Sequence, residues 1–85
     1  MVDCYIAVRS VTYAQKLMRL LNAQGIHARM TKSPKEISTG GCGHAVWVKN
    51  ADPAQLRAMI TTSGMPMFRI FLTTDQENFR EYFSL

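Results

Sequence analysis

Cysteine is scarce in this chain, in which only Cys4 and Cys42 occur among 85 residues. Two thiols without a secretory leader do not make the disulfide framework that stabilises small exported domains. The N-terminal residues lack the basic and long apolar segments of such a leader, and no apolar run approaches the length that crosses a bilayer. We therefore expect a cytoplasmic protein with both thiols reduced and no membrane partner.

Charge blocks and familiar catalytic motifs are also lacking. The net charge of +4 is spread without a run of like charges, which permits an acidic partner but does not require one. There are no paired carboxylates, no phosphate-binding loop and no dinucleotide fingerprint. Cys4, His27, Cys42 and His44 are metal-ligand types, but no Cys-x-x-Cys or His-x-x-x-His pair occurs among them. The sequence thus predicts neither a bound cofactor nor a metal site.

The chain does contain alternating strand-like and helix-like segments, separated by capping and turn residues. In order they are a strand over Cys4–Val8, a helix from Ser10 to Gly25, strands over Ile26–Thr31 and His44–Lys49, a helix from Asp52 to Gly64 and a strand over Met67–Thr73. This order predicts one α+β domain over residues 1–85, a ferredoxin-like split βαβ sandwich (βαββαβ). Its four-stranded antiparallel sheet carries both helices on one face, and we expect strands one and three to be parallel central neighbours.

The face of the sheet away from the helices offers one functional interpretation. Alternation along the strands places aromatic and basic side chains there: Tyr5, Arg9, Arg29, Trp47, Lys49, Arg69 and Phe71. Such a face suits single-stranded RNA, so a small RNA-binding or protein-interaction module is one hypothesis. The simpler alternative is that this face is covered, either by the tail at 74–85 or by a second copy in a homodimer. Aromatic residues at helical spacing in the tail predict a short helix there.

The most distinctive stretch is the glycine-rich loop Ser38-Thr39-Gly40-Gly41-Cys42-Gly43-His44. Glycine lets another molecule approach the backbone closely, and successive backbone N–H groups in such a turn form a nest that attracts anions. A cysteine held there is accessible, and its thiolate is electrostatically favoured. The alternative is a glycine-rich turn in which the cysteine is incidental. Ile37, the only large apolar residue in the preceding connection, is expected to pin the loop to the body.

With this loop the sequence resembles a family of small bacterial selenium/sulfur carrier-like proteins. The likeness spans Tyr5 to Val48 and rests on the first helix, on Pro34, on Ile37-Ser38 and on Cys42-Gly43. The resemblance implies a carrier or accessory protein more than a stand-alone enzyme. The Cys42 thiolate would take a chalcogen from a donor protein, hold it as a persulfide or selenyl sulfide, and present it to an acceptor.

The other candidate residues have supporting roles. Ser38, Thr39 and the backbone amides of the turn can donate hydrogen bonds to a thiolate, while Gly40, Gly41 and Gly43 give room. One interpretation of Lys35 and His44 is that they add positive charge near the thiolate. The alternative is that Lys35 is a solvated side chain and His44 an ordinary residue at the start of its strand. Lys35 stands where an arginine is expected in the family.

Cys4 has two interpretations. It is either a small buried hydrophobic residue in a strand or a resolving thiol for Cys42, on the reasoning that parallel neighbours begin at the same end of the sheet.

Overall fold

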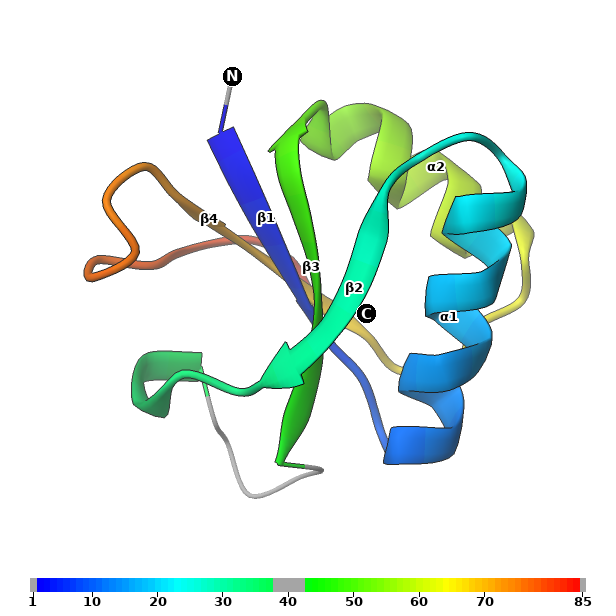
Figure 1. Cartoon of the computed structure of the whole chain (residues 1–85), viewed down its shortest axis with the longest axis horizontal. Coiled ribbons are helices and arrows are strands. Elements are labelled where there is room, and N and C mark those ends of the chain that lie inside the picture. The colour runs from blue at the N-terminus through cyan, green and yellow to red at the C-terminus, as the bar shows by residue number, and fades with distance from the viewer. Residues whose placement is uncertain (1, 38–42, 85) are drawn as a thin grey trace.

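The computed structural model describes residues 2–37 and 43–84 (Figure 1). In chain order the elements are β1 (Val2–Ala7), α1 (Val11–Ala23), β2 (Ala28–Lys32), the short 3-10 helix η1 (Lys35–Ile37), β3 (His44–Ala51), α2 (Pro53–Thr62), β4 (Arg69–Thr73) and β5 (Arg80–Ser84). The α+β class, with two helices and an antiparallel sheet, agrees with the sequence prediction. The predicted number of strands is wrong, because the sheet has five strands instead of four.

Both helices begin at the capping residues that the sequence indicated. The Ser10 side chain accepts a hydrogen bond from the backbone N–H of Tyr13, which would otherwise lack a partner in the first turn of α1. Asp52 does the same for α2 by accepting from Ala54 N at 3.0 Å, and Pro53 occupies the first helical position. Local hydrogen bonds therefore define where each helix starts.

The strand order across the sheet is β2-β3-β1-β4-β5, and every neighbouring pair is antiparallel. The predicted parallel pairing of strands one and three is therefore wrong: β1 and β3 run in opposite directions, with Ala7 opposite Ala45. The reason is that α1 carries the chain back to where β1 began, so β2 runs in the direction of β1. The connection from β2 to β3 then reverses the chain, and β3 lies between the two. The ferredoxin-like assignment itself stays a prediction.

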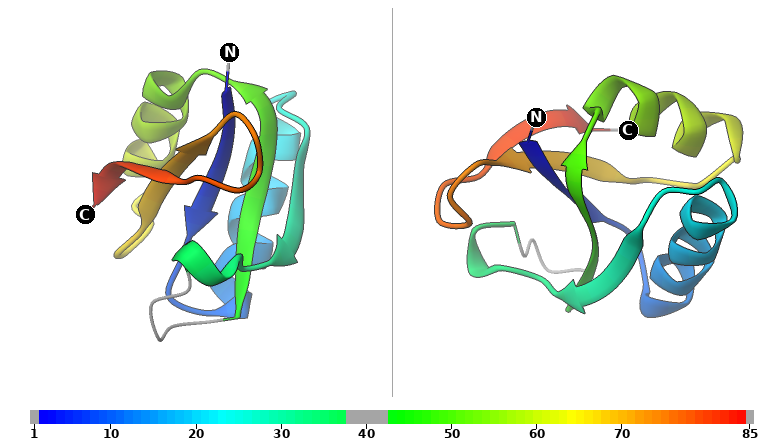
Figure 2. Two further views of the ribbon diagram at one scale, coloured as in Figure 1. Left: turned by 90° about the vertical axis from the view of Figure 1, so that its left-hand side faces the viewer. Right: turned by 45° about the horizontal axis from the view of Figure 1, so that its top comes forward.

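The main core lies between the sheet and the two helices. Cys4 and Ile6 of β1 belong to the same buried cluster as residues of α1 and α2, which places both helices on one face (Figure 2). The fully buried helix residues in this cluster are Ala14, Leu17, Leu21, Leu56 and Ile60. A second, smaller cluster on the opposite face comprises Tyr5, Ile37, Ala45 and Phe71. η1 and the β4–β5 connection lie on this second face (Figure 2).

The tail forms a strand, so the predicted tail helix is wrong. β5 pairs with β4, placing Phe83 opposite Ile70, and gives partners to backbone groups that an edge strand would leave unpaired. Phe79 lies before the strand and packs edge-on against Tyr5, with ring centroids 5.2 Å apart. Phe83 instead packs against Phe68 at 5.4 Å. The helical spacing of the tail aromatics was misleading because Phe79 and Phe83 serve different clusters.

The turn between β4 and β5 is built around the carboxylate of Asp75. Its oxygens accept hydrogen bonds from Asn78 N at 2.8 Å, Glu77 N at 2.9 Å and Asn78 Nδ2 at 2.9 Å. These bonds, the one from Asn78 N first, hold the pKa of Asp75 well below its usual range. The ionised carboxylate therefore stabilises this turn and, through it, the placement of β5.

We expect Asp75→Ala to lower the thermal unfolding midpoint at neutral pH and to speed amide exchange in β5. Because the folded pKa is depressed, the stabilisation is present above the unfolded value near 3.8 and is lost as pH falls through the folded value. The difference between the native chain and Asp75→Ala should thus shrink below about pH 4. Glu77→Ala is the matched control, since the Glu77 backbone N–H contributes to the turn and its carboxylate does not. An equal loss in both variants would contradict this role for Asp75.

Candidate functional site

The central part of the predicted site lies outside the described residues. This applies to Cys42 and to its neighbours Ser38, Thr39, Gly40 and Gly41. Pro34, Lys35, Gly43, His44 and Cys4 are described, and they show how the two ends of the loop are attached to the body.

The two ends of the loop are attached to the body at different places. Ile37, the last residue of η1, is 1% exposed and packs in the second core cluster, which confirms the expectation that it anchors this connection. On the other side, Ser33 N donates to the carbonyl oxygen of Gly43 at 2.9 Å, next to the pairing of Lys32 with His44. The chain therefore leaves the folded body on the second face of the sheet and re-enters it beside the end of β2.

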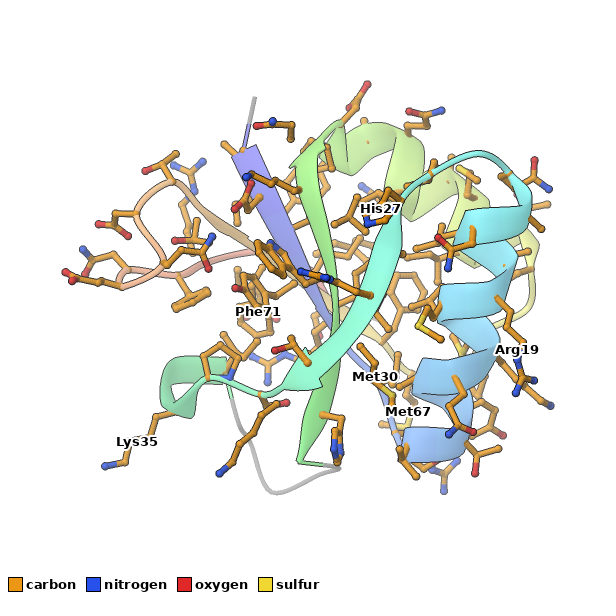
Figure 3. The ribbon with its side chains drawn as sticks, viewed as in Figure 1. Arg19, His27, Met30, Lys35, Met67 and Phe71 are labelled. Atoms are coloured by element: carbon orange, nitrogen blue, oxygen red, sulfur yellow. The ribbon has the colours of Figure 1, made fainter. Side chains whose placement is uncertain are left out.

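Gly43 is exposed, and a Cβ added to it would meet no atom of residues 2–37 and 43–84 within 4 Å. His44 is exposed at the first position of β3, and Lys35 is exposed on η1 with its side chain directed away from the sheet (Figure 3). Pro34 precedes η1, and its carbonyl oxygen accepts from Ile37 N.

Cys4, by contrast, is fully buried in the main core. Burial, followed by the carboxylates of Asp3 and Asp52, raises the pKa of this thiol to about 12. The thiol is therefore protonated at neutral pH and shielded from reagents. Its interpretation as a small buried hydrophobic residue is confirmed.

The geometric argument for Cys4 as a resolving thiol fails. It assumed parallel neighbours that start at the same end, whereas antiparallel pairing places Cys4 opposite Val48. Val48 lies four residues along β3 from His44, which is about 13 Å at the rise of an extended strand. The resolving role stays a prediction without that support.

We expect the stability of the protein to fall between about pH 9 and pH 12 because of Cys4. The unfolded thiol ionises near pH 9, whereas the folded thiol keeps its proton to about pH 12. Over this interval the folded state binds more protons than the unfolded state, so the free energy of unfolding decreases as pH rises. Urea unfolding of the native chain and of Cys4→Ala, measured across this range, should show a steeper decline for the native chain. Tyr5→Phe controls for the phenol, whose pKa is also raised by burial. Parallel declines in the native and Cys4→Ala proteins would contradict the assignment.

The sheet face proposed for RNA is largely filled by protein. Tyr5 is 7% exposed and Phe71 is 5% exposed, because Ile37 and Phe79 pack over them. Trp47 stacks on Tyr5 with ring centroids 5.9 Å apart. Stacking platforms for nucleobases need accessible rings, so this packing argues against the RNA hypothesis. The homodimer stays a prediction.

Trp47 has a feature that the sequence reasoning missed. Its indole Nε1 is buried without a hydrogen-bond partner in the described part of the chain, and Arg29 lies over its ring at 5.7 Å. No sequence signal distinguishes a paired indole from an unpaired one. Because Trp47 is the sole tryptophan and lies three residues from His44, its fluorescence is a direct reporter of changes near the loop.

Hollows in the surface lie away from the loop attachments, among them two that border the helices. One, of about 340 Å³, lies between α1 and α2 and is lined by Leu20, Gln24, Ala58, Met59, Thr62 and Ser63. The other, of about 480 Å³, lies near the start of β2 and the end of β3, with His27 and Asp52 in its wall. Over residues 2–37 and 43–84, no three His, Cys, Asp or Glu side chains gather in a way that could hold a metal ion. None of the described helices is long and apolar enough to span a membrane.

Comparison with known proteins gives one match. The model of a family described as "Putative Se/S carrier protein-like" matches residues 3–72. This range begins in β1, includes the Cys42 loop and ends in β4, so β5 falls outside it. No curated protein and no solved structure matched the chain.

Proposed function

The chain belongs to the Se/S carrier-like family, and from this we propose that it holds a sulfur or selenium atom on Cys42 and passes it to a partner protein. The observation that supports this most strongly is the burial of the other thiol. The chain has two cysteines, and Cys4 is fully buried with its pKa raised to about 12. Because the thiolate is the nucleophile in sulfur transfer, Cys42 is left as the residue for this chemistry.

The proposed loading step needs no external oxidant. The Cys42 thiolate attacks the outer sulfur of a donor persulfide, R–S–SH, and a new sulfur–sulfur bond forms on Cys42. The donor's sulfur–sulfur bond breaks, and the donor leaves as the thiolate RS⁻. The proton of the original persulfide group stays on the transferred sulfur, so Cys42 ends as a persulfide. Selenium transfer follows the same electron count, with selenium as the outer atom.

Delivery is the same exchange in reverse. A nucleophilic thiolate of the acceptor attacks the outer chalcogen, and Cys42 is released as the thiolate. The described residues support a scaffold for this cycle because the Ile37 anchor and the Ser33–Gly43 hydrogen bond attach the two ends of the loop to the body. Lys35 and His44, one on each side of the loop, are exposed.

Intact-mass measurement after incubation with a low-molecular-weight persulfide tests the proposal. The native chain is expected to gain the mass of one sulfur atom, which a reductant then removes. Cys42→Ala should gain none, while the matched variant Cys4→Ala should load like the native chain if it is folded. Equal loading of the native chain and Cys42→Ala would overturn the assignment of Cys42, and no loading of the native chain would overturn the carrier function for sulfur.

A further inference from the structure

Charged side chains are distributed unevenly between the two ends of the sheet. At the end where β1 finishes and β3 starts, Arg9, Lys32 and Lys35 are all exposed. Arg69 begins β4 at this end, but its charge is matched by Glu81 of β5, with 2.9 Å between Arg69 Nε and Glu81 Oε2. Three basic residues therefore remain at this end outside that ion pair, against one further acidic residue, Glu36, which follows Lys35 in η1.

The opposite end of the sheet is acidic. It holds four of the six acidic residues of the chain, and these are Asp3, Asp52, Asp75 and Glu77. Asp3 pairs with Thr73 near the start of β1, and its carboxylate accepts from Asn50 N near the end of β3. Lys49 and Arg80 offset part of this negative charge. The domain is therefore polarised along its strands, although its net charge is modest.

The basic end is the end that carries the Cys42 loop. Lys32 pairs with His44, and Cys42 precedes His44 by two residues. Arg9 follows β1, which is the other neighbour of β3. Adjacent strands lie about 4.8 Å apart, so the ends of β2 and β1 are separated by about 10 Å. Lys32 and Arg9 thus leave the sheet on the two sides of the strand that the loop enters.

We propose that this end, defined by Arg9, Lys32 and Lys35, is a docking surface for an acidic patch on the protein that exchanges the chalcogen with Cys42. This inference rests on the proposed carrier function. A carrier must present one particular end to its partner, and a charge separation along the molecule turns that end toward an acidic surface during the encounter. The electrostatic attraction between the two surfaces then raises the rate at which the partner protein meets the Cys42 end of the chain, and it does so without requiring a tight complex.

The arrangement fits a protein surface better than a small anion or a nucleic acid. A small anion is bound by donors that converge in a pocket, whereas Lys35 points away from the sheet (Figure 3) and the hollows described above are lined by other residues. Nucleic acid would gain little from the neighbouring face, where Tyr5 and Phe71 are packed under protein. Spread, exposed cations suit a spread, acidic partner surface.

Thiol exchange with charged peptides measures this preference directly. The probes are three peptides whose single cysteine is activated as a pyridyl disulfide and is flanked by glutamates, glutamines or lysines. The Cys42 thiolate attacks the peptide sulfur, a mixed disulfide forms, and thiopyridine leaves with a change in absorbance. At low ionic strength we expect the glutamate peptide to react about 10-fold faster than the lysine peptide. Added salt should bring the two rates together.

Substitutions locate the preference on the surface. Arg9→Gln, Lys32→Gln and Lys35→Gln together should bring the rates for the glutamate and lysine peptides to within about 2-fold of each other. The matched control combines Lys16→Gln, Arg19→Gln and Lys49→Gln, which removes the same charge from exposed positions on α1 and near the far end of β3. The control should keep most of the preference. Both variants are checked by circular dichroism for native folding.

The outcomes separate this inference from the carrier proposal. Equal rates for the three peptides in the native chain, or a preference that the triple variant at the basic end retains, would overturn the docking surface even where Cys42 still loads with sulfur. An equal loss in the control variant would show net charge to be the cause and would also overturn it. A preference located at the basic end in a chain that takes up no chalcogen would instead overturn the carrier function while leaving an acid-binding surface.

Discussion

Iodoacetamide is expected to alkylate Cys42 at least about 10³-fold faster than Cys4 in the folded protein. Cys4 is fully buried, so its thiol becomes accessible only when the surrounding structure opens. A domain of this size is stable by several kcal/mol, which limits the fully opened fraction to about 10⁻³ or less. The raised pKa of Cys4 slows its reaction further, because it keeps the thiol protonated.

Single-cysteine variants make this comparison clean. Cys4→Ala reports the reaction of Cys42, and Cys42→Ala reports the reaction of Cys4, each followed by mass spectrometry at neutral pH. In concentrated urea the two rates should converge, because unfolding removes the burial that distinguishes them. A Cys42 that reacts as slowly as Cys4 in the folded protein would remove the physical basis of the carrier function. A fast Cys4 would instead show that the main core opens far more readily than expected.

The helices could be predicted from the sequence because their signals are local. Ser10, Asp52 and Pro53 lie within a turn of the groups that they cap or start, so the relevant interactions are between near neighbours in the chain. The strand segments were likewise visible from their alternation, and the alternation correctly placed Tyr5 and Phe71 on the face away from the helices.

Strand direction and strand number required information that is not local. The antiparallel pairing of β1 with β3 follows from how the chain crosses over and returns, and no residue in either strand encodes it. β5 was missed because its aromatic spacing fits a helix equally well. What favours a strand over a helix at residues 80–84 is the edge of β4, which would otherwise lack hydrogen-bond partners. That edge exists only after the sheet has formed, so the local sequence does not reveal it.

Within the candidate site, the attachment at Ile37 can be compared with the structure, whereas the role of Cys42 stays a prediction. The anchoring role of Ile37 followed from a single apolar residue in a polar connection, and its burial confirms it. The cover over Tyr5 could not be read from the sequence in the same way, because Ile37 and Phe79 come from segments more than forty residues apart. The charge separation between the ends of the sheet also needed the strand directions, since Asp3 and Arg9 are close neighbours in sequence.

Deletion of the residues after Thr74 is expected to lower the free energy of unfolding by about 3 kcal/mol or more. The deletion removes β5 and exposes the edge of β4. It also removes Phe79 from Tyr5 and Phe83 from Phe68. Full burial of one such side chain stabilises a protein by about 1.5–3 kcal/mol, and Phe79 and Phe83 are both half-buried. The two rings and the lost β4–β5 hydrogen bonds together therefore account for the expected decrease, which is a large part of the stability of a small domain.

Urea unfolding followed by Trp47 fluorescence measures this loss, and sedimentation at several concentrations shows whether the bared edge of β4 causes association. The full-length variant Phe79→Ala is the control that separates the two contributions, since it uncovers Tyr5 while leaving β5 paired. We expect it to lose stability without gaining a tendency to associate.

The matched family region ends at residue 72, and an unchanged unfolding midpoint in the truncated, monomeric chain would mean that this region folds without β5. In that case the fifth strand would be an addition to a self-sufficient four-stranded sheet, and the cover over Tyr5 would depend on Ile37 alone.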